Sequence, residues 1–164
     1  MKEENTKLFN LVNMDDADIS TEAKPIIGTQ ALATCFGILL YERKKKQALV
    51  AHVSTTYLPA VMKLFELIDL NSDNTFEYLI IPGYYSVQED HYDIQRQLLK
   101  IFNKGEILNT KFIPFTEQKK FEDIVQLDKK TLSYEFAFDS RTGKFVNNDV
   151  YFGIEYLEYK EKAK

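Results

Sequence analysis

"CFGILLYERKKKQALVAHVS", residues 35–54, contains two apolar runs separated by a short charged segment. Both runs are rich in branched aliphatic residues, which favour β-strands. Because the runs are close in sequence and joined by a polar connection, they predict a β-hairpin. Both faces of each expected strand are apolar, which is typical of strands covered on both sides. We therefore expect the hydrophobic core to form around this hairpin.

The length and composition are those of one globular domain. The chain has 164 residues, of which 45% are hydrophobic, 28% charged and 13% aromatic. A chain of this size forms one hydrophobic core. The formal net charge of −4 argues against a nucleic-acid partner, since phosphate binding requires clustered Lys and Arg on one face. The basic residues 43–46 are better explained as the solvated tip of the hairpin.

Cys35 is the only cysteine, and His52 is one of two histidines. These residues cannot form an internal disulfide or a Cys-rich zinc site, so we expect no structural metal and no cofactor. The N-terminal residues lack the pattern of a signal peptide, and no apolar run approaches the length of a membrane span. We expect a cytoplasmic protein without membrane insertion; the alternative is an exported effector without a cleaved signal.

The chain changes character at Pro25. This predicts a polar N-terminal arm over residues 1–24, in which only "KLFNLV" could pack as a short first element, a single α/β domain over 25–157 and a charged tail over 158–164. After the hairpin, the expected elements follow from hydrophobic spacing and turn signals. They are a helix over 57–70 that packs through Val61, Leu64, Phe65 and Ile68, a strand over 74–81, a helix from Ser86 to about Phe102, a strand over 107–115, a hairpin around 139–143, and a last strand over 150–159. Residues 116–130 fit either a short helix or a surface insertion.

The hairpin brings a thiol close to an imidazole. If Glu42 to Lys45 form a four-residue loop, Cys35 and His52 lie directly opposite each other on one face of the ladder. An imidazole in contact with a thiol activates the sulfur as a nucleophile. A third group usually orients the ring, and Thr29 is a candidate through its hydroxyl or its carbonyl. The alternative is that Cys35 and His52 are simply packed in the core.

The spacing of these three residues is similar to that of a known enzyme family. Thr29 is followed by Cys35 six positions later and by His52 seventeen positions after that, with "LLYE" after the Cys and "AHV" around the His. This pattern resembles the CheD family of chemoreceptor glutamine deamidases, and the Cys and His pairing is similar to that of the cytotoxic necrotizing factor toxins. The resemblance implies a layered α/β sandwich with a mainly antiparallel or mixed sheet and two to three helices.

The resemblance also implies the roles of the site residues: Cys35 as the nucleophile, His52 as the general base and later acid, and Thr29 as the group that orients His52. The chain departs from the family where Ala31 and Ala33 replace glycines before the Cys. Side chains at these positions restrict the backbone angles that glycine allows.

The expected function is a cysteine-dependent amidohydrolase that deamidates glutamine side chains of a protein substrate through a thioester, or hydrolyses methyl esters in the same way. Thr34, Thr55 and Tyr84 are candidate substrate-binding residues. The partner is a protein with an exposed glutamine, either a chemoreceptor or another protein. One alternative is a non-catalytic binding or scaffold protein of the same fold; another is a transamidase. The sequence does not indicate the oligomeric state.

Overall fold

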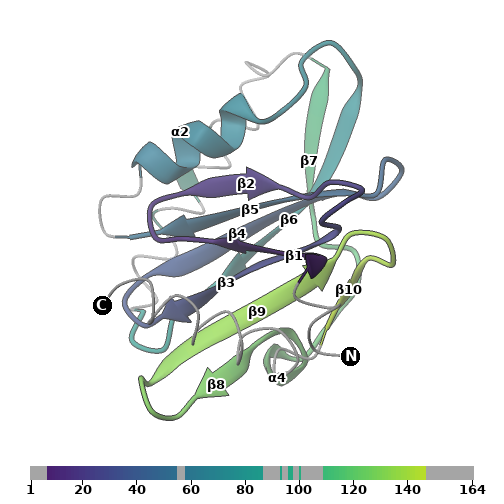
Figure 1. Cartoon of the computed structure of the whole chain (residues 1–164). Helices are drawn as coiled ribbons and strands as arrows, with labels where there is room; N and C mark the ends of the chain where they lie inside the picture. The colour runs from purple at the N-terminus through teal and green to yellow at the C-terminus, as the bar shows by residue number, and fades with distance from the viewer. Residues whose placement is uncertain are drawn as a thin grey trace.

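The computed structural model describes residues 7–54, 58–86, 93, 96, 97, 100 and 109–146. They form a mixed α/β fold that consists mostly of strands with two helices (Figure 1). The elements, in chain order, are β1 (Phe9–Val12), β2 (Ala17–Ile19), β3 (Ile26–Leu32), β4 (Phe36–Glu42), β5 (Gln47–Val53), α2 (Leu58–Glu66), β6 (Asn74–Ile81), β7 (Thr110–Pro114), α4 (Phe121–Ile124), β8 (Gln126–Asp128), β9 (Ser133–Asp139) and β10 (Lys144–Phe145).

The strands form two sheets of five strands each. The first sheet has the order β1-β3-β9-β10, with β8 paired to β9, and the second has the order β2-β5-β4-β6-β7. The β1–β3 and β6–β7 pairs are parallel, whereas the other described pairs are antiparallel. The expectation of a layered fold with mainly antiparallel or mixed sheets is confirmed.

Strand β4 occupies the centre of the second sheet, and all seven of its residues are buried. Its alternate side chains enter two separate clusters, because successive residues of a strand point to opposite faces. Ile38 and Leu40 pack with helix α2, whereas Leu39 and Tyr41 pack against Phe136 and other residues of the first sheet. The molecule therefore has three layers, with helix α2, the second sheet and the first sheet in that order.

Helix α2 has the packing face that the sequence predicts. Val61 and Leu64 are buried in the cluster between the helix and the second sheet, and Phe65 packs against that cluster. The helix ends at Glu66 and not at residue 70, so Ile68 is buried in the same cluster from the segment that follows the helix. Pro59 lies in the first turn of the helix, where its missing N–H removes no intrahelical hydrogen bond. The expected strands at β6 and β7, and the hairpin formed by β9 and β10, are also confirmed.

The segment over residues 9–19 forms two strands and is not a polar arm, whereas residues 1–6 lie outside the described part of the chain. Strand β1 pairs in parallel with β3 in the first sheet, and β2 pairs with β5 in the second. Both are short strands at sheet edges, so they lack the long apolar alternation by which a strand is recognised from sequence. Phe9, Val12 and Ala17 are nevertheless buried in the core. The domain therefore begins before Pro25.

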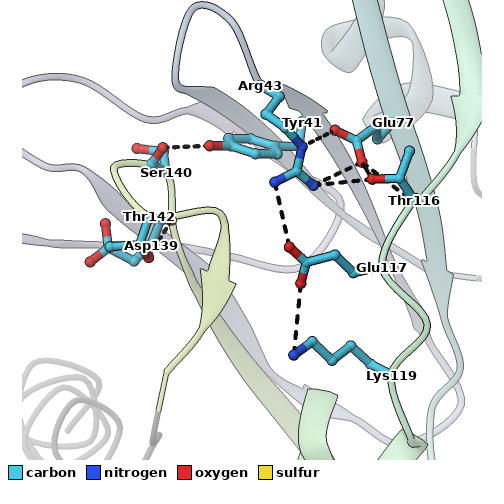
Figure 2. Close-up of polar contacts among 9 residues, drawn as sticks. All are labelled: Tyr41, Arg43, Glu77, Thr116, Glu117, Lys119, Asp139, Ser140 and Thr142. Atoms are coloured by element: carbon cyan, nitrogen blue, oxygen red, sulfur yellow. Dashed lines mark hydrogen bonds and ion pairs between the residues drawn. The ribbon is translucent and has the colours of Figure 1, made fainter.

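An ion-pair network joins the hairpin tip to the segment after β7 (Figure 2). Arg43 donates two hydrogen bonds to the carboxylate of Glu77, at 2.7 and 2.9 Å, and its guanidinium lies over the rings of Tyr41 and Phe115. The backbone N–H of Thr116 also donates to Glu77, at 3.0 Å. The network holds residues 115–119 beside the second sheet. Arg43 is thus part of a structural anchor, although the sequence suggested only a solvated tip.

Residues 116–130, which the sequence left undecided, contain both a short helix and a strand: α4 and β8. The expected strand over 150–159 and the charged tail over 158–164 lie outside the described residues, as does most of the expected helix from Ser86 to Phe102. None of the helices in the described part of the chain is long and apolar enough to cross a membrane.

Candidate active site

The candidate site lies where β4 begins and β5 ends. Cys35 directly precedes β4, and His52 is the next-to-last residue of β5. In the observed register His52 pairs with Gly37, so the predicted direct pairing of Cys35 with His52 is wrong by two residues. A shift of two residues preserves the face. Cys35 and His52 are therefore diagonal neighbours on the face that packs against the first sheet.

The register differs from the prediction because Glu42 belongs to the strand and not to the loop. Its carboxylate accepts hydrogen bonds from the N–H groups of Lys44 and Thr75, and Glu42 pairs with Gln47. The loop is therefore Arg43 to Lys46. Lys46 closes it with a left-handed φ of 51°, a conformation common at the end of four-residue hairpin loops.

The hydroxyl of Thr29 contacts the imidazole of His52. The Thr29 hydroxyl is completely buried in β3, and its Oγ1 lies 2.7 Å from Nδ1 of His52 and 2.6 Å from the carbonyl oxygen of Val12. A carbonyl can only accept, so the single hydroxyl proton is donated to Val12. The hydroxyl oxygen must then accept from Nδ1–H of His52. This fixes the proton on Nδ1 and leaves the lone pair on Nε2.

His52 is neutral at physiological pH. Its residue surface is only 2% exposed, and burial, partly opposed by the charge of Asp15, lowers the pKa of its imidazole from 6.5 to about 4. Nε2 is buried and has no hydrogen-bond partner among the described residues. The ring thus presents an unused acceptor on the face that it shares with Cys35. A neutral imidazole with a free nitrogen is the form that a general base requires.

Cys35 is buried, with 5% of its surface exposed. Burial raises the pKa of the Cys35 thiol; a hydrogen bond with the Thr34 side chain lowers it, and the negative charge of Asp15 raises it again, so that the net pKa lies above the ordinary value of 9.0. The thiol does not hydrogen-bond to Nε2. The resting pair is therefore a neutral thiol beside a neutral imidazole, not a thiolate and an imidazolium.

The loop before Cys35 adopts the backbone conformation that a glycine favours, although it contains alanines. Ala31 has a φ of 60°, in the left-handed region, and the N–H of Ala33 donates to the carbonyl of Ala31 at 3.1 Å. Strand β3 also has an irregularity between Thr29 and Leu32. Ala31 therefore adopts the left-handed conformation, and an L-residue in that region carries a steric cost.

The other predicted site residues have different positions. Thr34 is exposed beside Cys35, and Tyr84 is 39% exposed, with its ring against Tyr85 and Tyr134. The Tyr84 N–H donates to the carbonyl of Leu32, which places Tyr84 beside the loop that leads to Cys35. Thr55 lies outside the described residues.

The sequence analysis did not identify residues 12–16 as part of the candidate site. This segment crosses from the first sheet to the second beside the site: Val12 accepts from Thr29, and the Asp15 N–H donates to the carbonyl of His52 at 2.9 Å. The Asp15 carboxylate accepts from the hydroxyl of Ser54, the residue after β5. The local signal was weak, because the contact uses main-chain groups that every sequence provides. "NMDD" at 13–16 was nevertheless a turn signal between two short apolar segments.

No protein-family model matches the chain, and no curated protein matches it either. The described residues contain no group of three or more His, Cys, Asp or Glu side chains placed to hold a metal ion.

Proposed function

We propose that this protein is a cysteine-dependent amidohydrolase that deamidates glutamine side chains of a protein substrate. Cys35 is the nucleophile, His52 the general base and acid, and Thr29 the residue that orients His52. One observation carries the proposal: the hydrogen bonds of Thr29 to Val12 and His52 leave a bare Nε2 on the face that carries Cys35. A purely structural histidine would be expected to use both ring nitrogens when buried, because an unpaired polar atom is costly.

The protonation states favour general-base catalysis over a preformed ion pair. The pKa of His52 is lowered to about 4 and the pKa of Cys35 is raised, so the thiol keeps its proton until a substrate carbonyl is in place. The proton then passes from the sulfur to Nε2 as the bond between sulfur and carbonyl carbon forms. Cys35 and His52 are diagonal neighbours in the ladder, so this proton transfer requires the Cys35 side chain to rotate about the bond that carries its sulfur.

The reaction proceeds through a thioester. Sulfur attacks the side-chain carboxamide, and backbone N–H groups near Cys35 hold the oxyanion. The imidazolium of His52 protonates the departing nitrogen, so ammonia leaves as the carbon–nitrogen bond breaks. Neutral His52 then takes a proton from water, the resulting hydroxide attacks the thioester, and the thiol is restored as glutamate is released. A methyl ester would react by the same steps and release methanol.

Mass spectrometry of proteins incubated with the purified chain tests this function. We expect glutamine to be converted to glutamate at a restricted set of sites in a bacterial lysate, with release of ammonia, and no conversion with Cys35→Ala or His52→Ala. A purified chemoreceptor cytoplasmic domain is the first defined substrate to assay, because the resemblance to CheD proteins points to it. Conversion that is equal for wild type and Cys35→Ala would contradict the proposal.

A second candidate is a non-catalytic binding protein of the same fold. It is favoured by the burial of Cys35, the raised pKa of its thiol and the absence of a hydrogen bond between the thiol and His52. Alkylation separates the two candidates. In a catalytic protein iodoacetamide modifies Cys35 of the folded chain, and His52→Ala slows the reaction. In a scaffold protein Cys35 reacts only after unfolding, and His52→Ala has no effect on the folded chain.

A further inference from the structure

The turn formed by residues 82–86 lies against the loop that carries Cys35. The N–H of Tyr84 donates to the carbonyl of Leu32 at 2.9 Å, and the N–H of Tyr85 donates to the carbonyl of Ala33 at 2.7 Å. The backbones approach so closely that a Cβ added to Gly83 would lie 2.1 Å from the carbonyl oxygen of Cys35. The turn and the loop are therefore in direct backbone contact.

The hydroxyl of Ser86 completes this contact at the nucleophile itself. The N–H of Gly83 donates to Oγ of Ser86 at 2.9 Å, and Oγ donates to the carbonyl oxygen of Cys35 at 3.0 Å. The direction of both bonds is fixed, because the N–H can only donate and the carbonyl can only accept. Ser86 is thus the side chain that links the turn to the main chain of Cys35.

These bonds fix the direction of the backbone donors in the loop. In a trans peptide the C=O and the N–H point in opposite directions. Since the carbonyls of Leu32, Ala33 and Cys35 point to the turn over residues 82–86, the N–H groups of the same peptide units, those of Ala33, Thr34 and Phe36, point away from it. The Ala33 N–H already donates to the carbonyl of Ala31, and Phe36 belongs to β4, where it pairs with Val53. The N–H of Thr34 is therefore the donor that this contact aims toward a ligand. Backbone N–H groups aimed from one side are the usual means of stabilising an oxyanion.

We propose that Ser86 is a positioning residue for acyl transfer at Cys35, which holds the 31–35 loop so that the N–H of Thr34 stabilises the oxyanion. This inference rests on the proposed function only in assigning acyl chemistry to Cys35. It does not depend on glutamine being the substrate. Ser86 does not touch the reacting atoms, so its effect is on the geometry of the loop and not on the reactivity of the thiol.

Two small probes separate oxyanion stabilisation from thiol reactivity. Acylation of Cys35 by p-nitrophenyl acetate passes through a tetrahedral oxyanion, whereas alkylation by iodoacetamide is a displacement at carbon that forms none. We expect Ser86→Ala to slow acylation roughly 10- to 100-fold while the alkylation rate changes less than about twofold. Ser86→Thr keeps the hydroxyl and should recover most of the acylation rate. Thr21→Ala, which removes a hydroxyl that caps an exposed turn elsewhere, is the matched control and should change neither rate.

The outcomes are separable from those of the deamidase assay. The inference is wrong if Ser86→Ala lowers both rates equally, if Ser86→Thr fails to restore acylation, or if wild-type Cys35 is alkylated but not acylated. It is supported if acylation alone depends on the hydroxyl, even where no glutamine is converted in any lysate. In that case the deamidase proposal fails and the acyl-transfer geometry stands.

Discussion

At the scale of single residues, the proton on the Thr29 hydroxyl decides which nitrogen of His52 is available for chemistry. The hydroxyl donates to Val12 and accepts from Nδ1, so the free lone pair is on Nε2. Thr29→Val has almost the same shape but removes the acceptor for Nδ1–H. The imidazole then loses both its orientation and the preference for one tautomer.

We expect Thr29→Val to lower the rate of acyl transfer at Cys35 by at least about 100-fold, since a wrongly oriented general base loses most of its effect. Thr29→Ser keeps the hydroxyl and should retain most of the rate. The rate of Cys35 acylation by p-nitrophenyl acetate is measured for both variants, and circular dichroism confirms that each variant is folded. A folded Thr29→Val variant with wild-type acylation would show that His52 does not act through this contact.

Ala31 is one of two residues at which the sequence has alanine where CheD proteins have glycine, and its backbone is strained. Its φ of 60° costs an L-residue about 1–2 kcal/mol, of which the higher unfolded-state entropy of glycine would offset about half. Ala31→Gly should therefore raise the free energy of unfolding by about 0.5–1 kcal/mol. Ala33 has no such φ, so Ala33→Gly should be neutral or destabilising. Urea unfolding of the two variants measures this difference, and equal effects would contradict it.

At the scale of elements, the closeness of the 82–86 turn to the Cys35 loop depends on Gly83. An alanine there would place its Cβ 2.1 Å from the carbonyl oxygen of Cys35 and 2.5 Å from that of Ala33, both backbone atoms that cannot rotate aside. We expect Gly83→Ala to destabilise the fold by about 2 kcal/mol or more and to slow acylation of Cys35.

Gly37→Ala provides the comparison for Gly83, because its nearest contact is a side-chain carbon of Phe136, at 2.8 Å. A ring can shift slightly, so the loss of stability should be smaller. Chemical denaturation gives the free energies of unfolding, and the p-nitrophenyl acetate reaction gives the effect on the loop. If Gly83→Ala lowered the free energy of unfolding less than Gly37→Ala does, the close approach of the two backbones would not depend on the glycine at position 83.

The elements that sequence reasoning predicted are those with strong local patterns. The β4–β5 hairpin was correct because two runs of branched apolar residues flank a short charged segment, and helix α2 was correct because its apolar residues repeat at a period close to 3.6. The hairpin register was wrong by two residues because it depends on Glu42, whose carboxylate is held by Thr75, a residue 33 positions away. Strands β1 and β2 were missed because their pairing is non-local and each contains at most four residues.

The same distinction explains which parts of the candidate site could be predicted. Thr29, Cys35 and His52 lie in or beside strands with strong apolar patterns, so their spacing in the sequence was enough to predict that they lie near one another. The carbonyl of Val12 and the bridging hydroxyl of Ser86 act on partners that are distant in sequence, at separations of 17 and 51 residues. Ser86 was expected to begin a helix, and nothing in the local sequence indicates that its hydroxyl bonds to the main chain of Cys35.

At the scale of the whole molecule, the site exists only while the two sheets are packed together. Thr29 and Val12 belong to the first sheet, whereas His52 belongs to the second, and one hydrogen bond of 2.7 Å joins the two sides. Figure 1 shows the two sheets stacked, with β3 and β9 facing β4 and β5. Because His52 is buried and neutral between the two sheets, the stability of the sheet packing depends on whether its imidazole is protonated.

The direction of that coupling follows from the pKa values. Folded His52 has a pKa of about 4, against 6.5 for an unperturbed histidine. Above pH 6.5 both the folded and the unfolded chain have a neutral ring, and the full stability is present. As the pH falls from 6.5 towards 4, the unfolded chain binds a proton that the folded chain does not, and the free energy of unfolding decreases by roughly 3 kcal/mol. Carboxylates add their own dependence at the lower end of this range.

His52→Asn should remove this part of the acid sensitivity. The variant is expected to be less stable than wild type at pH 7, because the contact with Thr29 is altered. The difference in unfolding free energy between wild type and variant should decrease as the pH falls from 6.5 towards 4. Only the wild type contains the buried neutral histidine whose contribution to stability is lost over this range. Urea unfolding at a series of pH values measures both curves, and the carboxylate contributions cancel in their difference. Parallel curves over that interval would mean that His52 is accessible to protons in the folded state, and thus that the two sheets do not exclude water from Nε2.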